Sequence, residues 1–420
     1  MTQATPSLQR SEGLPGFEGA LLARFSVATN TKAQVPNLGA GNPTTTRDPL
    51  SIDPETARAN SLERYRLLGE LRPFSLPRTA SCRRKRVSHT VQVQRRPDGG
   101  YQLAGCETCG SVWGCPCCAS KIYAGRTLEV QQALRLWQHN ERHYAAMLTL
   151  TVAHEYGDQL KRMRKGLSHA WRLLWQGKAA KAIRERLGIA HYIRAVEVTH
   201  GRNGWHPHLH ILLLTTRKLE AFHEDELAER WQGCVVRALG IAAKPSKEHG
   251  CNLSHDFRQD YIEKLGLEIT DIENKRGKLG SKTPWTIAHE AADGIPSARH
   301  LWETYVHEMK GARQLTWSRK SKRYFGLLDV EDDELASDGV PIVEGVAGVM
   351  GEWTGVDWDA CCREFPDWTS RVIAAAASEL PFTALARLPR IRAVSPPWIV
   401  FPERPAPDPP APMRVAPVSV

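Results

Sequence analysis

No run of apolar residues in the 420-residue sequence approaches the roughly 18 to 20 residues that a membrane-spanning helix requires. Residues 1–20 contain no apolar stretch of the kind that marks a secretory signal. We therefore expect a cytoplasmic protein with no membrane partner. In a reducing compartment, the ten cysteines favour metal ligands or buried thiols over a disulfide framework.

The aspartate-rich clusters that hold two metal ions in many nucleases are also missing. Basic residues instead outnumber acidic ones, 56 to 46, and give a formal net charge of +10. This excess favours a polyanionic partner. The basic side chains gather in runs at 83–86, 161–165 and 319–323. One such run is usually a solvated surface, whereas several in one basic chain favour nucleic acid.

The order of strand-like and helix-like patterns predicts an α+β fold with a central antiparallel sheet and helices on one face. A small cysteine-rich, zinc-binding element and disordered tails complete the expected chain. Strands are predicted at 145–152 and in a hairpin over 191–215. Helices are predicted at 120–139, at 159–187 (one helix, or two broken at Gly177), at 219–239 and at 257–267.

Composition divides the chain into five expected regions. These are a disordered N-terminal region at 1–75, a cysteine-rich basic element at 76–125, the main α+β domain at 126–328, a C-terminal region of unknown role at 329–395 and a Pro-rich tail at 396–420.

Two histidines, His208 and His210, stand at alternate positions of one apolar strand. Side chains alternate between the faces of a strand, so both imidazoles project to one face while Leu209 and Ile211 project to the other. Imidazole is the commonest metal ligand, and a pair at this spacing converges on one ion. A lone histidine would more often be a satisfied core residue, but the pair predicts a metal site. His206 is expected beside the ligands, because Pro207 interrupts the alternation.

The dipeptide Asn203-Gly204, between this strand and the preceding one, is a strong hairpin signal. A two-residue loop at these positions places Thr199 opposite His208, and Glu197 opposite His210. Directly opposed residues share a face, so we expect Glu197 to be the third metal ligand. A one-residue slip would turn Glu197 away, and a solvated strand carboxylate is then the alternative interpretation.

Two C-x-x-C pairs stand five residues apart in the cysteine-rich segment. Thiolates are soft ligands that bind Zn²⁺ at ~2.3 Å, so we predict a structural zinc. The predicted ligands are Cys106, Cys109, Cys115 and Cys118. The gap between the pairs is shorter than in the usual zinc ribbon, so Cys82 is an alternative ligand that would leave Cys117 or Cys118 over. Reduced, buried cysteines are the interpretation without a metal.

With these motifs in place, the chain resembles the rolling-circle plasmid replication initiators of the HUH endonuclease superfamily. Residues 205–210, preceded by 197–201, resemble the His-hydrophobic-His motif of that family. Residues 148–151 are similar to its upstream strand motif and residues 106–118 to its cysteine-rich segment. Trp302, Gly311 and residues 313–318 resemble the end of its domain. The resemblance covers about residues 80–328.

The resemblance implies an endonuclease that nicks one strand of the double-strand origin and links a tyrosine to the 5′-phosphate. The freed 3′-hydroxyl then primes rolling-circle DNA replication. The implied partners are plasmid origin DNA, both double-stranded and single-stranded, with a host helicase and a host DNA polymerase. Mg²⁺ or Mn²⁺ held by Glu197, His208 and His210 would polarise a phosphodiester oxygen.

The nucleophile of the family lies on a helix after the metal strand, in a Tyr-x-x-Lys context that Tyr261 and Lys264 match. At i, i+3 on a helix the phenol and the ammonium share a face. The cation would favour the phenolate and steady the charge of the phosphate. Tyr305 and Tyr324 are rival nucleophiles, because either could instead be a packing residue.

Family members with one tyrosine use an acidic residue to activate water at termination. Asp260 is our assignment, with Asp256 and Glu263 as alternatives. A transposase would place a second tyrosine near Tyr261, and a mobilisation relaxase would place its tyrosine ahead of the histidines. A non-catalytic, zinc-containing DNA-binding regulator, in which both metal sites are closed, is the alternative from a different class.

Overall fold

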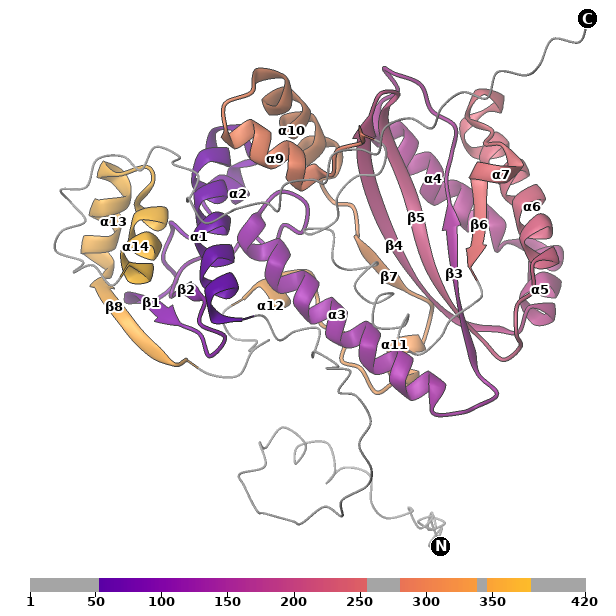
Figure 1. Ribbon diagram of the computed structural model, residues 1–420, viewed down its shortest axis with the longest axis horizontal. Helices are drawn as coiled ribbons and strands as arrows, with labels where there is room; N and C mark the ends of the chain where they lie inside the picture. The colour runs from indigo at the N-terminus through magenta and orange to yellow at the C-terminus, as the bar shows by residue number, and fades with distance from the viewer. Residues whose placement is uncertain (1–52, 255–279, 338–345, 379–420) are drawn as a thin grey trace, which may run out of the picture. The chain divides into compact units, whose positions relative to one another are not determined.

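A five-stranded sheet organises much of the computed structural model, which describes residues 53–254, 280–337 and 346–378 (Figure 1). The strand order is β6-β3-β5-β4-β7, and every neighbouring pair is antiparallel. The strands are β3 (Tyr144–Leu150), β4 (Ile189–Gly201), β5 (Gly204–Thr215), β6 (Cys251–Ser254) and β7 (Leu315–Trp317). The predicted α+β class with a central antiparallel sheet is therefore confirmed.

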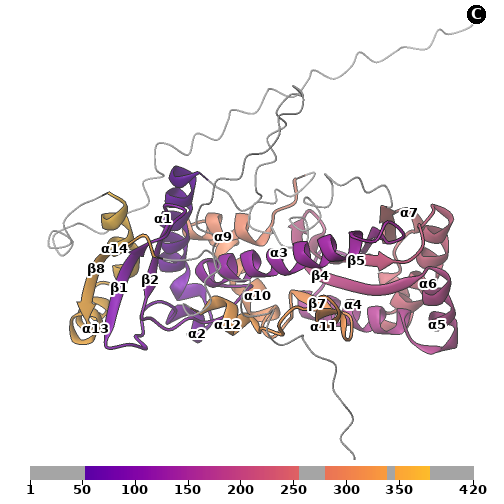
Figure 2. The ribbon, with the colours of Figure 1, turned by 90° about the horizontal axis from the view of Figure 1, so that it is seen from below.

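The second half of β5 is apolar on both faces, because residues 211–214 are all fully buried. Leu209 and Leu213 belong to a core that includes α4 (Leu160–Leu174) and α6 (Phe222–Leu239), whereas Leu212 and Leu214 belong to a second core with α3 (Pro116–Gln138). Figure 2 shows α3 and α4 on opposite sides of the sheet. A strand segment that is apolar at every position needs cover on both sides, so α3 adds a helix on the face that was expected to be open.

The β4–β5 hairpin pairs in a different register from the predicted one. Gly201 pairs with Gly204, so the turn lies one residue earlier than predicted, and Glu197 pairs with His208. Gly204 has a φ of 83°, the left-handed conformation that often follows a type I turn in a hairpin. Each cross-strand partner has shifted by two residues. A shift of two keeps every side chain on its face, so Glu197 still shares a face with His208 and His210.

A second, three-stranded sheet has the order β2-β1-β8. It consists of β1 (Thr90–Arg95), β2 (Tyr101–Ala104) and β8 (Gly348–Thr354). Helices α1 (Pro54–Leu71) and α14 (Trp368–Ala377) pack on each other and on β2, and α13 (Gly355–Glu364) packs on β8 and β1. Residues 346–378, whose role could not be predicted from the sequence, thus complete a sheet that begins at residue 90.

Helix α1 lies where we expected disorder as far as residue 75. Its buried residues include Ala57, Ser61, Tyr65 and Leu68, which recur at helical spacing along one side. Asp53 caps the helix by accepting a hydrogen bond from Thr56 N at 2.9 Å. The expectation failed because charged residues between the buried positions lower the apolar content of the segment. Residues 1–52 lie outside the described part of the chain.

The remaining helices are short or flank the sheets. They are η2 (Arg72–Phe74), α2 (Pro77–Ala80), α5 (Gly177–Arg186), η3 (Ile241–Ala243), α7 (Lys247–Gly250), α9 (Pro284–Ala292), α10 (Pro296–Glu308), α11 (Ser321–Tyr324) and α12 (Asp332–Ala336). The helix pattern over 159–187 is a pair, α4 and α5, broken before Gly177. The helix predicted at 257–267 lies outside the described residues. Within the described ranges, no helix is both long enough and apolar enough to cross a membrane.

Candidate functional site

Glu197 of β4 and His208 and His210 of β5 bring three potential metal ligands together on one face of the sheet. The Nε2 atoms of His210 and His208 lie 2.9 Å and 3.4 Å from Glu197 Oε2. The strand register produces this geometry, since Glu197 pairs directly with His208 and His210 is the next residue on the same face. The three side chains are 10%, 12% and 17% exposed, so the group remains accessible from solvent.

The other nitrogen of each imidazole faces an oxygen. His208 Nδ1 lies 3.3 Å from the backbone oxygen of His206, which can only accept, so a hydrogen bond between them requires the proton on Nδ1. His210 Nδ1 lies 3.3 Å from Thr149 Oγ1 on β3, and a hydroxyl can accept the same kind of bond. A neutral imidazole with its proton on Nδ1 has a free lone pair on Nε2. Metal-binding histidines usually have this arrangement, in which the second nitrogen donates to an oxygen.

This donor set fits a divalent cation. Two imidazole lone pairs and a carboxylate oxygen that face one another are favourable neighbours only when a cation or a proton lies between them. Adjacent ligands of an octahedral ion at about 2.1 Å are about 3.0 Å apart, close to the separations between Glu197 and the two histidines. Three protein ligands leave further positions for water or substrate, as catalytic sites require.

Two more histidines extend the row beyond these three residues. The ring of His206 lies 5.1 Å from that of His208 and stacks at 4.6 Å on His154. Burial, and after it the neighbouring His208 and His154 side chains, lowers the pKa of His206 to about 3, so its imidazole is neutral. His154 could not be predicted from the sequence, because it stands in the loop after β3 and no local pattern shows that this loop returns to β5.

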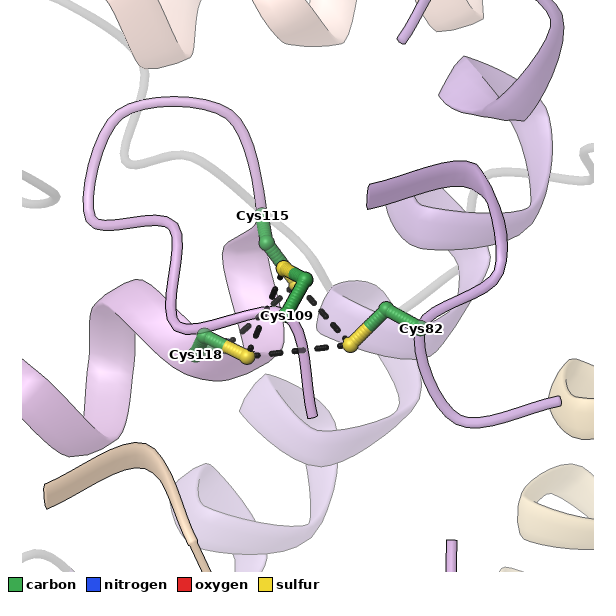
Figure 3. A group of neighbouring side chains, drawn as sticks. All are labelled: Cys82, Cys109, Cys115 and Cys118. Atoms are coloured by element: carbon green, nitrogen blue, oxygen red, sulfur yellow. Dashed lines mark hydrogen bonds between the residues drawn. The ribbon is translucent and has the colours of Figure 1, made fainter. Parts of the chain in front are cut away.

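Four buried cysteines, Cys82, Cys109, Cys115 and Cys118, form a second group whose ligand atoms lie within 4.8 Å of one another. Figure 3 shows their sulfur atoms pointing toward one another. Sγ of Cys82 lies 3.6 Å from the Sγ atoms of Cys115 and Cys118, and Cys109 Sγ lies 3.7 Å from Cys118 Sγ. A disulfide needs about 2.05 Å, whereas tetrahedral ligands at ~2.3 Å from one ion are about 3.8 Å apart. The group therefore has the dimensions of a four-thiolate zinc site.

Cys82 stands where the sequence analysis expected Cys106. Backbone hydrogen bonds join the loop after α2 to the segment before Cys109, from Arg83 N to Glu107 O and from Glu107 N to Lys85 O. This pairing, which also forms a bridge between Arg86 and Cys106, brings Cys82 beside the other three sulfurs. Cys106 is buried in the neighbouring core. The departure arises from contacts between distant segments, which the spacing of cysteines cannot reveal.

Cys117, which lies between the two cysteines of the second pair, stays out of the group. Its Sγ lies 3.8 Å from the backbone oxygen of Arg64, and burial raises the pKa of its thiol to about 12. Cys115 and Cys118 converge because they lie at the start of α3, where Cys118 N lies 3.5 Å from Cys115 Sγ.

Two buried arginines, Arg72 and Arg83, adjoin the four-cysteine group and are 8% and 1% exposed. Arg72 donates to the backbone oxygen of Cys82 at 3.0 Å, and Arg83 donates to that of Leu103 at 2.7 Å. Burial, followed by the charge of Arg84, lowers the pKa of Arg72, and Cys82 opposes both effects. Four thiolates around Zn²⁺ would carry two net negative charges, which the two guanidinium groups would offset.

The predicted nucleophile Tyr261 and its neighbours Asp260 and Lys264 lie outside the described residues, but the rival tyrosines lie within them. Tyr305 is 2% exposed and stacks on Trp205 at 5.9 Å, and burial raises its pKa well above the usual range. It is a packing residue.

Tyr324 is 60% exposed and its ring lies 4.6 Å from that of His191, which pairs with Leu214. Leu214 is four residues from His210 and six from His208 on β5. Tyr324 therefore lies beside a part of the hairpin that is about 13 to 20 Å along the strand from the two histidines. Its position argues against it as the nucleophile.

Known proteins match the segment of this chain that contains the Glu197–His208–His210 group and three of the four grouped cysteines. The model of a family described as "Replication protein" matches residues 101–346. "Protein rep" of Streptomyces lividans is 26% identical over 350 residues, which cover 63% of this chain and 76% of that protein. "Protein rep" of Bacillus amyloliquefaciens is 28% identical over 165 residues, 37% of this chain and 44% of its own length.

A "Neomycin resistance protein" of Streptomyces cyanogenus is 28% identical over 161 residues, 32% of this chain and 37% of its own length. No solved structure gives a significant match.

Proposed function

The chain belongs to the replication protein family, and from that premise we propose that it initiates the replication of a plasmid by the rolling-circle mechanism. It binds the double-strand origin, nicks one strand and leaves a free 3′-hydroxyl for a host DNA polymerase, while a host helicase opens the duplex. The net charge of +10 supports a nucleic-acid partner.

The convergence of Glu197, His208 and His210 on one face of the sheet carries the proposal. When bound there, Mg²⁺ or Mn²⁺ supplies a Lewis acid for an oxygen of the scissile phosphodiester. The chain itself holds the donor atoms in place, because the hydroxyl of Thr149 and the backbone oxygen of His206 engage the Nδ1 atoms of the two histidines. The site is then organised before DNA arrives.

We assign Tyr261 as the nucleophile, from its place in the Tyr-x-x-Lys sequence. Its phenolate oxygen attacks the phosphorus, a bond forms between this oxygen and the 5′-phosphate, and the bond from phosphorus to the 3′ oxygen breaks. The proton that the phenol loses passes by way of solvent to the departing 3′ oxygen, which becomes the free 3′-hydroxyl. Lys264 favours the phenolate and offsets charge on the phosphate, and Asp260 activates the water that later releases the tyrosine.

The four-cysteine group serves the fold in this proposal. With all four sulfurs buried and directed inward, it leaves no position for a substrate, which is typical of a structural zinc site. The zinc would tie the loop at Cys82, the loop at Cys109 and the start of α3 to one another.

A covalent adduct with DNA tests the nucleophile. Full-length protein is incubated with supercoiled DNA of its own origin and Mn²⁺, and the expected product is a protein–DNA adduct that withstands denaturant. Tyr261→Phe should abolish it, whereas Tyr156→Phe and Tyr324→Phe, at exposed tyrosines, should not. An adduct formed by Tyr261→Phe would exclude Tyr261. Absence of an adduct with the unchanged protein would exclude the enzyme class.

A further inference from the structure

Helix α4 presents an outer face made of cations. Lys161, Arg162, Lys165 and Arg172 are all exposed, and at 100° per residue they lie within an arc of about 100°. The helix contains no aspartate or glutamate at all. Exposed His169 lies within the same arc.

These four cations have no acidic partner in the described part of the chain. None of the ion pairs formed there includes any of them. Glu308 lies near the first turn, but its Oε2 accepts from the backbone N–H of Lys161 at 2.7 Å. Among the described residues, no neighbouring acidic side chain therefore offsets the positive charge of this helix face.

The opposite side of α4 is committed to the core. Met163, Leu167 and Trp171 are buried in the core that also holds Leu209 and Leu213 of β5. The helix cannot turn this apolar side to a lipid bilayer without unfolding the domain. The exposed side of α4 offers cationic side chains and no apolar surface to insert into lipid. A rigid polyanion is therefore a better binding partner for it than a membrane.

The dimensions of the face suit a duplex. From Lys161 to Arg172 the helix rises about 16 Å. Double-stranded DNA carries one charge per ~1.7 Å of its axis, so this length spans about ten phosphates. A row of cations without an acidic partner in the described ranges can therefore follow the backbone of a duplex without any contact to bases.

We propose that the outer face of α4 binds the phosphate backbone of duplex DNA, whatever its sequence. The inference rests on the proposed function for the identity of the duplex, which would be the DNA that flanks the nick. Since α4 packs on the face of the sheet opposite to His208 and His210, a duplex held there leaves the metal-binding face open to the cleaved strand (Figure 2).

Binding at several salt concentrations tests the proposal. Fluorescence anisotropy measures the affinity of the full-length protein for a labelled duplex of unrelated sequence. The unchanged protein is compared with a variant in which Lys161, Arg162, Lys165 and Arg172 are all changed to Gln. The slope of log K against log salt should become shallower by up to about 3.6, or about 0.9 for each cation, and affinity at low salt should fall at least about tenfold.

A matched variant controls for net charge. Arg78, Lys181, Arg186 and Lys247 are also exposed, and each has an acidic partner, so changing all four to Gln removes the same charge. This variant should bind nearly as the unchanged protein does. An equal loss in both variants, or a loss in neither, would overturn the proposal. So would an α4 variant that binds DNA normally but no longer binds phosphatidylserine vesicles. Circular dichroism must show that both variants fold.

The outcome is separable from the nicking reaction. Tyr261→Phe should bind the duplex with an unchanged salt slope. If the unchanged protein never nicks its origin but its salt slope depends on the α4 cations, the proposed function is wrong and the DNA-binding face stands. If the α4 variant nicks its origin normally and its affinity for duplex DNA is unchanged, the DNA-binding face is wrong and the proposed function stands.

Discussion

The four-cysteine group and the Glu197–His208–His210 group differ in how their ligands are brought together. The cysteines come from separate loops and the start of a helix, are all buried, and leave no ligand position open. The glutamate and histidines come from one hairpin, whose backbone hydrogen bonds set their spacing, and they remain partly exposed. A metal at the first group would complete the fold, whereas a metal at the second would use a fold that already exists.

The largest effect is expected at the cysteine group. Cys115→Ser should remove the zinc and lower the free energy of unfolding by at least about 4 kcal/mol, because structural zinc contributes its binding energy to folding. In a domain of this size that corresponds to a fall in Tm of about 10 °C. Metal content by mass spectrometry and thermal unfolding measure both. Cys117→Ser is the control and should keep its zinc, while a Cys115→Ser protein with unchanged zinc and Tm would contradict the assignment.

At the hairpin, the expected effect is on activity alone, with stability left unchanged. His208→Ala should reduce nicking about a thousandfold, or about 4 kcal/mol of transition-state stabilisation, because it removes a metal ligand. Its Tm and its zinc content should stay close to those of the unchanged protein. His307→Ala, at an exposed histidine, should nick normally. If His208→Ala lost its zinc or its fold, the contrast between the two groups would fail.

The smallest effect concerns the residue that orients a ligand. Thr149→Val keeps the shape of the side chain but removes the oxygen that faces His210 Nδ1. The Mn²⁺ concentration needed for half-maximal nicking should rise about 10- to 100-fold, with the rate at saturating Mn²⁺ less affected. Thr149→Ser should restore the unchanged response. A Thr149→Val protein with the original Mn²⁺ dependence would show that the hydroxyl does not position the imidazole.

Local rules were enough to predict that His208 and His210 share one face of the sheet, because the alternation of side chains depends only on the strand itself. Glu197 was placed on the correct face although the predicted turn was wrong by one residue. Moving a two-residue turn by one position shifts partners by two, and two is the repeat of a strand. The sheet face on which Glu197 lies was thus easier to predict than its cross-strand partner.

Contacts between distant segments could not be read in the same way. Cys82 joins the other sulfurs through a pairing between the loop after α2 and residues 105–107, and nothing in the cysteine spacing encodes that pairing. The second helical layer follows from residues 211–214, whose apolar run was visible, but the sequence does not say which helix covers the added face. Strand β8 pairs with β1 across more than two hundred and fifty residues, which no local pattern predicts.

Helix α3 connects the two halves of this comparison. Cys115 caps its N-terminus and Cys118 lies in its first turn, while its last turns place Leu134 and Trp137 against the end of β5. With 23 residues it is about 34 Å long. An unbroken helix of that length behaves as a stiff rod, so tilting one end displaces the other. The cysteine end of α3 therefore helps to fix the position of the end that covers Leu212 and Leu214. A shift at the cysteine end would move the helix against β5, the strand that carries His208 and His210.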